Sequence, residues 1–249
     1  MSIGIVVPAY RPDTARLESY LRSLLSTFDD PVVRVELDDP GPETLDAVVE
    51  LELPVEIATV PYRRGKGAAV TAGFEALDTD RLAFADADGS TPAAELRRVV
   101  EALDGADIAV GSRRHPAARV GGHRTFARRF LGDGFAWLAR RLLDVALYDY
   151  QCGAKALSAD AWGAVRTHLY EPGFAWDVEL VAVAGALDLR VVECPIEWTD
   201  RAGSTVSPIR TTVSMARTLG VARRRANRLA SSHADSTRAS TLALVDRNR

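Results

Sequence analysis

The chain has 249 residues, enough for one large α/β domain or for a domain with an appendage, and its 47% hydrophobic and 26% charged residues are typical of a globular protein. Its formal net charge of −3 argues against a general nucleic-acid binder, although the arginine-rich segments 113–141 and 210–228 would suit an anionic ligand or surface. No apolar run reaches the 18 residues of a membrane-spanning helix, no signal peptide is visible, and Cys152 and Cys194 lack metal-ligand spacing, so we expect a protein of the reducing cytoplasm.

Strands and helices alternate along the first half of the chain. Short apolar runs predict strands, and apolar residues at helical spacing, such as Leu17, Leu21 and Leu24, predict the helices between them. We expect strands over residues 3–7, 32–37, 55–60, 82–85 and 107–111, and helices over 14–28, 42–51, 65–77 and 92–103. Because the connections are short, this pattern predicts an α/β fold with a mixed, mostly parallel sheet and helices on both faces.

The pattern changes after Gly111. The following residues indicate a loop over 119–122, a long helix over 125–145, strands over 154–157 and 190–198, a helix over 177–187 and a basic helix over 209–229. The last residues are small and polar and predict disorder. We therefore expect a domain over residues 1–207, a basic amphipathic helix over 208–230 and a disordered tail over 231–249.

Two carboxylates stand at the end of the central predicted strand. Asp86 and Asp88 follow the apolar run 82–85, and Ser90-Thr91-Pro92 predicts the start of a helix with a hydroxyl cap. In extended backbone, residues two apart point to the same side, so both carboxylates can face one point beyond the sheet, where open α/β sheets bind ligands. Such a pair suits Mg²⁺ or Mn²⁺ bridging a diphosphate. A solvated turn is the alternative.

Other polar residues follow neighbouring strands. Pro8 and Tyr10 end the first strand, and Asp38-Asp39 ends the second, where a carboxylate can accept hydrogen bonds from a base or ribose or can simply form a turn. The stretch Arg63-Arg64-Gly65-Lys66-Gly67 places cations at a helix N-terminus, which favours an anion. These residues together predict a site for a nucleotide diphosphate-sugar.

The ordered set of motifs between residues 3 and 207 resembles the family 2 glycosyltransferases of the GT-A fold, which is Rossmann-like. The similarity is closer to the dolichyl-phosphate glucose and mannose synthases, and Asp149-Tyr150-Gln151-Cys152-Gly153-Ala154-Lys155 looks more like the glucosyl members. One departure is Arg11-Pro12, where the family usually has Asn-Glu, and Asp13 could supply the missing carboxylate. The other stretches that carry the resemblance are Val7–Tyr10, Gly65–Val70, Asp86–Pro92, Gly111–Arg113, Phe174–Glu179 and Glu193–Trp198.

The resemblance implies a role for each matching residue. Asp86 and Asp88 would hold the metal, Mg²⁺ or Mn²⁺, with the donor diphosphate. The candidate catalytic residues are Asp88, Asp149 and Arg128. The candidate substrate-binding residues are Pro8, Tyr10, Asp13, Asp38, Asp39, Lys66, Arg113, Arg124, Gln151, Asp177 and Glu179. Two alternatives stay open: the arginines of 113–141 could form a solvated helix face, and Asp177 could cap the helix that contains Glu179.

The function implied is inverting, metal-dependent transfer of a hexose, by preference glucose from UDP-glucose, to a polyprenyl or dolichyl phosphate. The resemblance implies that Arg113, Arg124 and Arg128 face the phosphate of this lipid. A lipid phosphate is already an anion at neutral pH, so arginines that orient it matter more than a general base. The alternatives are mannose transfer from GDP-mannose, another glycan acceptor, or a non-catalytic partner subunit. We expect a peripheral protein at the cytoplasmic face of a membrane, attached weakly through the basic helix, which could instead pack on the catalytic domain.

Overall fold

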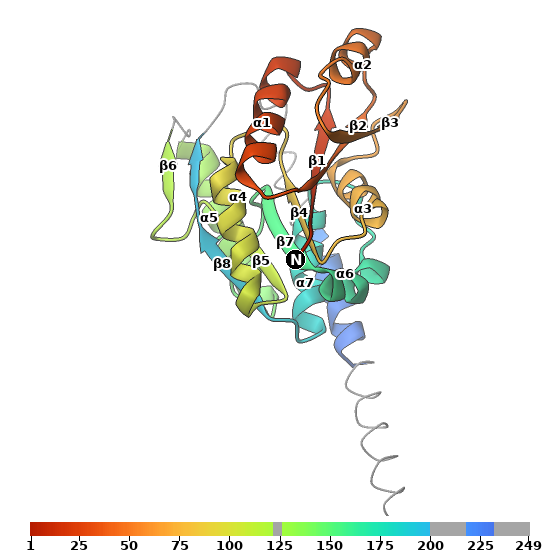
Figure 1. Cartoon of the computed structure of the whole chain (residues 1–249). Coiled ribbons are helices and arrows are strands. Elements are labelled where there is room, and N and C mark those ends of the chain that lie inside the picture. Colours follow the sequence, from red (N-terminus) through yellow and green to blue (C-terminus); the bar gives the residue numbers. More distant parts are fainter. Residues whose placement is uncertain (122–125, 200–217, 232–249) are drawn as a thin grey trace, which may run out of the picture.

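The computed structural model describes residues 1–121, 126–199 and 218–231, and its centre is a seven-stranded sheet with helices on both faces (Figure 1). The strand order is β3-β2-β1-β4-β7-β5-β8, and β7 alone runs antiparallel to its two neighbours within this sheet. The predicted mixed, mostly parallel sheet is confirmed. The strands of this sheet are β1 (Ile3–Tyr10), β2 (Val32–Asp38), β3 (Val55–Val60), β4 (Arg81–Ala85), β5 (Ile108–Ser112), β7 (Ala154–Ser158) and β8 (Val191–Pro195).

The helices divide between the two faces because the strand side chains alternate. Ile5 and Val7 of β1 face the helices on one side, and Val6 between them faces the other side, so the strand reads as a continuous apolar run. The first face is covered by α1 (Thr14–Thr27), α2 (Pro42–Val49) and α4 (Ala93–Glu101). The second is covered by α3 (Lys66–Ala76), α5 (Phe126–Leu142), α6 (Ala159–Val165), α7 (Trp176–Ala186) and a helix over residues 218–231.

Two sequence predictions in the second half were wrong. The expected loop over 119–122 contains a strand, β6 (Arg119–Gly121), and the expected strand over 190–198 is two strands, β8 and β9 (Glu197–Thr199). They separate at the buried residue Ile196, whose amide donates to Ser112 O at 3.1 Å and whose carbonyl accepts from Arg119 N at 3.1 Å. These bonds let β9 pair with β6 in a second small sheet, a long-range pairing that no local pattern indicates.

Helix caps also differ from the prediction. Ser90 and Thr91 are buried and do not cap α4, which begins at Ala93 with Pro92 as its N-cap residue and without a side-chain cap. The hydroxyl cap occurs instead at α6, an element that the sequence analysis missed, where Ser158 Oγ accepts from Ala161 N at 3.1 Å. Ser158 directly after an apolar run was the signal for that helix.

The described part of the basic helix packs on the catalytic domain. Leu219, Ala222 and Ala226 are buried in the same core cluster as α5 and α7, and Arg225 pairs with Glu179 at 2.7 Å. Residues 209–217 of the predicted helix and 232–249 of the predicted tail lie outside the described residues, so the division of the chain at residue 207 stays a prediction. Among the described helices, none combines the length and the apolar character needed to cross a membrane.

Candidate active site

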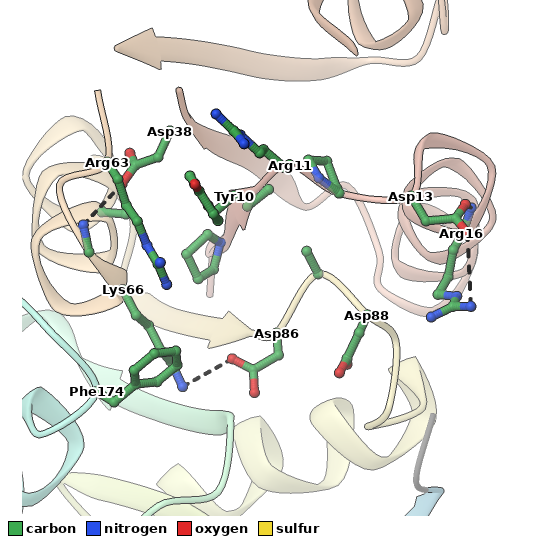
Figure 2. Close-up of a pocket in the computed structure, with 16 residues that line it drawn as sticks. Tyr10, Arg11, Asp13, Arg16, Asp38, Arg63, Lys66, Asp86, Asp88 and Phe174 are labelled. Carbon is green, nitrogen blue, oxygen red and sulfur yellow. Dashed lines mark hydrogen bonds and ion pairs between the residues drawn. The ribbon is translucent and has the colours of Figure 1, made fainter. Parts of the chain in front are cut away.

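A cleft of about 480 Å³ opens beyond the carboxyl ends of β1, β2 and β4, the position where open α/β sheets bind ligands (Figure 2). Its walls come from the segments at the ends of β1, β2, β3 and β4 and from the segment before α7. Because β1 to β4 are parallel, their carboxyl ends lie at one edge of the sheet. The polar and aromatic residues that line it are Tyr10, Arg11, Asp13, Arg16, Asp38, Arg63, Lys66, Asp86, Asp88 and Phe174.

Asp86 and Asp88 both face this cleft, as Figure 2 shows, although not through extended backbone. The strand ends at Ala85, and the next residues form a turn closed by Gly89 N donating to Asp86 O at 3.3 Å. Gly89 has φ of 62°, which glycine adopts without strain. Asp88 Oδ1 accepts from Ser90 N at 2.8 Å, so the carboxylate is oriented while remaining exposed. The turn, rather than strand alternation, therefore presents both carboxylates.

This turn has the donors that a hard divalent cation needs. In the described part of the chain, no cluster of three or more acidic, histidine or cysteine ligands is present, so two carboxylates would be completed by water and diphosphate oxygens, as Mg²⁺ prefers. The hydroxyls of Tyr20 and Ser90 are buried beside the turn without a hydrogen-bond partner in the described structure. The ring of Tyr20 packs under Gly89, so unused polar groups border the two carboxylates. The residues present fit a Mg²⁺ or Mn²⁺ ion.

A chain of alternating charges leads from Asp86 into the core. Lys66 Nζ lies 3.0 Å from Asp86 Oδ1 and 3.2 Å from Asp177 Oδ2, and the other Asp177 oxygen lies 2.6 Å from Lys155 Nζ. Burial lowers the pKa of Lys66, but the carboxylates of Asp177 and Asp86 outweigh it and hold that pKa above its usual value. Likewise burial raises the pKa of Asp86, yet Lys66 brings it below its usual value. Lys66 and Asp86 are therefore both charged at neutral pH.

Asp38 organises the loop that carries Lys66. Its Oδ2 accepts from the backbone amides of Arg64 and Gly65 at 2.7 and 3.1 Å, and its Oδ1 accepts from Arg64 Nε at 2.7 Å. Gly65 has φ of 100°, and a Cβ there would lie 2.5 Å from Pro172 O. Asp38 lines the cleft, but its main contacts hold this loop, and the predicted contact with a base or ribose stays a prediction.

The predicted nucleotide residues line the opposite wall. Tyr10 has two arginines against its ring, with the Arg63 guanidinium 4.2 Å and the Arg11 guanidinium 5.4 Å from the ring centre. Asp39 pairs with Arg11 at 2.9 Å, and Asp13 caps α1 by accepting from Arg16 N at 3.0 Å. Pro8 also lines this wall. Arg11-Pro12, which departs from the usual family pattern, therefore adds a cation to the cleft wall, and this cation pairs with Asp39.

Asp149 and Arg113 form a buried ion pair and neither lines the cleft. Asp149 is 1% exposed, and it accepts from Arg113 Nε at 2.7 Å, Arg113 Nη2 at 3.0 Å, Arg113 N at 3.1 Å and Gln151 N at 3.1 Å. Burial raises the pKa of Asp149, but Arg113 dominates and holds it far below its usual range. Asp149 was predicted as catalytic, and Arg113 was predicted to face the acceptor phosphate. In the structure each is the ion-pair partner of the other, and the amide of Gln151 donates to the same carboxylate.

Glu179 is a structural carboxylate rather than part of the cleft wall. It is 1% exposed, and its Oε2 accepts from the amides of Tyr170 and Glu171, both at 2.7 Å, while its Oε1 pairs with Arg225. These bonds fix the segment that brings Phe174 to the cleft. Glu179 thus ties this segment to the helix over 218–231, and its predicted substrate contact stays a prediction.

Some site residues were missed or lie outside the described part of the structure. Arg124 is outside the described residues, and Arg128 lies on α5 at a position whose side chain is not described, so their contacts with an acceptor stay predictions. Lys155, Phe174 and Arg63 lie in stretches that the sequence analysis quoted, but none of the three was assigned a role of its own. Lys155 was signalled by its rarity, since it and Lys66 are the two lysines among 31 basic residues.

Gly153 gives a direct test of the site's packing. Its carbonyl accepts from Asp86 N at 3.1 Å, and a Cβ at this position would overlap the Asp86 carboxylate. We expect Gly153→Ala to displace that carboxylate and to lower transfer activity about 100-fold, with a loss of about 1–3 kcal/mol in the free energy of unfolding from overpacking. Gly163→Ala is the control, because nothing lies within 4 Å of its Cβ and it sits in α6. Equal activity of the two variants would contradict the prediction.

Comparisons with known proteins point to one family. Residues 4–145 match the model of the family described as glycosyl transferase family 2. Dolichyl-phosphate beta-glucosyltransferase from Mus musculus is 29% identical over 87% of this chain and 73% of its own, and the Drosophila melanogaster protein of the same name is 30% identical over 88% and 73%. Glycosyltransferase AglD from Haloferax volcanii is 30% identical over 86% of this chain but 36% of its own.

Solved structures show the same fold. Glucosyl-3-phosphoglycerate synthase from Mycobacterium tuberculosis, in complex with Mn²⁺, uridine diphosphate and glucosyl-3-phosphoglycerate, superimposes with a TM-score of 0.63 over 91% of this chain and 80% of its own. The sequence identity is 18%, so this likeness establishes the arrangement of strands and helices.

Proposed function

The chain belongs to glycosyl transferase family 2, and from this we propose that it transfers glucose from UDP-glucose to the phosphate of a polyprenyl or dolichyl lipid. The observation that carries the proposal is the pair of carboxylates, Asp86 and Asp88, which face one cleft at the carboxyl edge of the sheet. The relatives named as dolichyl-phosphate beta-glucosyltransferases support the sugar and the acceptor. The Mycobacterium tuberculosis synthase, which binds uridine diphosphate and Mn²⁺, supports the donor and the metal.

Different residues of the cleft would hold different parts of the donor. Asp86 and Asp88 would hold Mg²⁺ or Mn²⁺, and a bound ion would offset the charge that develops on the leaving diphosphate. Lys66, at the N-terminus of α3, adds a cation beside them. Tyr10 and Arg63 form a flat, cationic surface on the opposite wall, which suits a nucleobase. The cleft therefore orders the donor with its diphosphate at the carboxylates and its base at Tyr10.

The acceptor needs orientation more than activation. A lipid phosphate carries its own negative charge at neutral pH, so its oxygen can attack the anomeric carbon without giving a proton to a base on the protein, and in-line attack with departure of the diphosphate inverts the configuration. We assign the orientation of this phosphate to Arg124 and Arg128, in accordance with the sequence prediction. Asp149 is unsuited to act as a base because Arg113 and two backbone amides occupy it.

A lipid acceptor places the reaction at a membrane surface, which we take to be the cytoplasmic face. The described part of the basic helix supports peripheral contact, because its apolar residues Leu219, Ala222 and Ala226 face the core while Arg224 and Arg228 are exposed. An outer face of this kind suits anionic headgroups through charge rather than through insertion of apolar groups.

One assay distinguishes the candidate functions. Purified protein with Mn²⁺ is given radiolabelled UDP-glucose or GDP-mannose and either dolichyl phosphate or 3-phosphoglycerate, and the labelled product is extracted. We expect label from UDP-glucose in the lipid fraction. Label from GDP-mannose would favour the mannosyl alternative, label on 3-phosphoglycerate would favour the acceptor of the structural neighbour, and a folded protein without transfer or donor hydrolysis would indicate a non-catalytic subunit.

A further inference from the structure

Both lysines of the chain belong to one buried run of charges that ends at the metal-site carboxylate. The order is Lys155, Asp177, Lys66 and Asp86, with consecutive nitrogen–oxygen distances of 2.6, 3.2 and 3.0 Å. The side chains become more exposed along this order, from 0% at Lys155 to 9% at Lys66 and 44% at Asp86. Two positive and two negative charges balance each other, so the run is neutral in the metal-free protein.

Lys66 contacts the group that a divalent cation would also need. Its ammonium lies 3.0 Å from Asp86 Oδ1, and Figure 2 shows both side chains meeting inside the cleft. A cation ligated by Asp86 would stand close to this ammonium, and like charges at that separation repel strongly in a partly desolvated site. The cation and the lysine therefore compete for the same carboxylate.

Asp177 gives Lys66 a second partner that the cation would not reach. Asp177 is buried on α7, and its other oxygen is held by Lys155, which also donates to Cys152 O at 2.8 Å. The ammonium of Lys66 also lies over the ring of Phe84, with Nζ 4.9 Å from the ring centre. If Asp86 ligates a cation, Lys66 keeps its contact with Asp177. Its ammonium then has hydrogen-bond donors that are not used, and its charge is no longer balanced by Asp86.

We propose that Lys66 is a displaceable counter-ion that couples metal binding to nucleotide binding. Without nucleotide, Lys66 occupies Asp86 and weakens the hold on a divalent cation. A nucleoside diphosphate supplies the anion that the displaced ammonium needs, so the cation and the diphosphate bind together more tightly than either binds alone. This inference rests on the proposed function for the identity of the ligands, and it concerns binding rather than transfer.

The test measures Mn²⁺ and UDP binding by calorimetry, each alone and each in the presence of the other, in wild-type protein and in Lys66→Met. Removing the ammonium should tighten the binding of Mn²⁺ alone by about tenfold, because Asp86 no longer has a competing cation. It should weaken the binding of UDP in the presence of Mn²⁺ by about tenfold, because a charge-assisted contact to the diphosphate is lost. The ratio of Mn²⁺ affinities with and without UDP should therefore fall.

Arg63→Met is the matched control. Arg63 is a cation of the same cleft, but it stacks on Tyr10 and no contact joins it to Asp86 in the described structure, so its loss should leave the affinity for Mn²⁺ alone within about twofold. Asp177→Asn should change the affinity for Mn²⁺ alone in the direction opposite to Lys66→Met. It removes the charge of the second partner of Lys66, so the ammonium pairs more strongly with Asp86 and Mn²⁺ binds more weakly. Thermal unfolding of each variant shows that it is folded.

The outcomes separate this inference from the proposed function. If wild-type protein binds Mn²⁺ with UDP but Lys66→Met leaves the affinity for Mn²⁺ alone and the coupling ratio unchanged, the counter-ion role is wrong while the proposed function stands. Equal tightening by Lys66→Met and Arg63→Met would also overturn it, because the effect would then be one of net charge. If wild-type protein binds neither ligand, the proposed function fails as well.

Discussion

Asp88→Ala should abolish metal-dependent transfer while leaving the protein folded. Asp88 is exposed in the cleft, and its one described interaction is with Ser90 N at 2.8 Å, so its removal should cost about 1 kcal/mol in the free energy of unfolding. The loss of one of two carboxylates for the cation should lower the rate about 1,000-fold or more, which corresponds to about 4 kcal/mol in the activation barrier. Initial rates across a Mn²⁺ titration measure the effect.

Asp46→Ala is the control for this prediction. Asp46 is an exposed carboxylate on α2 and is not among the residues that line the cleft, so its replacement should change neither the rate nor its dependence on Mn²⁺. Asp88→Ala protein that is folded and transfers glucose at the wild-type rate would contradict the assignment of the metal site. A loss of activity that accompanies unfolding would instead show that the carboxylate supports the turn.

Asp149→Ala should destabilise the protein far more than the loss of an exposed ion pair does. It leaves the guanidinium of Arg113, whose side chain is 19% exposed, without its carboxylate, and breaking a buried pair in this way costs about 3–5 kcal/mol. The matched control is Glu197→Ala, which breaks the exposed pair with Arg119, whose side chain is 83% exposed, and should cost at most about 1 kcal/mol. Urea unfolding at pH 7 measures both.

The same pair predicts a dependence of stability on pH. Arg113 overcomes the effect of burial and holds the pKa of Asp149 below its unfolded value of about 3.9. A carboxyl group whose pKa is lowered in the folded state contributes its full stabilisation when the pH is above its unfolded pKa. This contribution is lost as the pH falls below about 4 toward the folded pKa. Wild-type protein should therefore lose more stability between pH 5 and pH 3, roughly, than Asp149→Ala does. Parallel pH profiles of the two proteins would contradict a depressed pKa.

The sequence by itself determined the framework of this protein. Apolar runs of strand length and apolar residues at helical spacing are local signals, so they predicted the parallel strands and their helices to within a few residues. The same local signals placed Asp86, Asp88, Tyr10 and Lys66 at the carboxyl ends of strands or at a helix start, and parallel topology is sufficient to bring such ends to one edge.

The tertiary structure alone decided which charged residues face the cleft and which hold one another. Asp149 pairs with Arg113 across 36 residues, Asp177 with Lys66 across 111, and Glu179 with Arg225 across 46. The sequence shows the carboxylates but not these partners, because the partners meet only when separate elements pack. Since a buried charge must find a counter-charge or hydrogen-bond donors, packing turned Asp149 and Glu179 inward and left Asp86 and Asp88 open to a ligand.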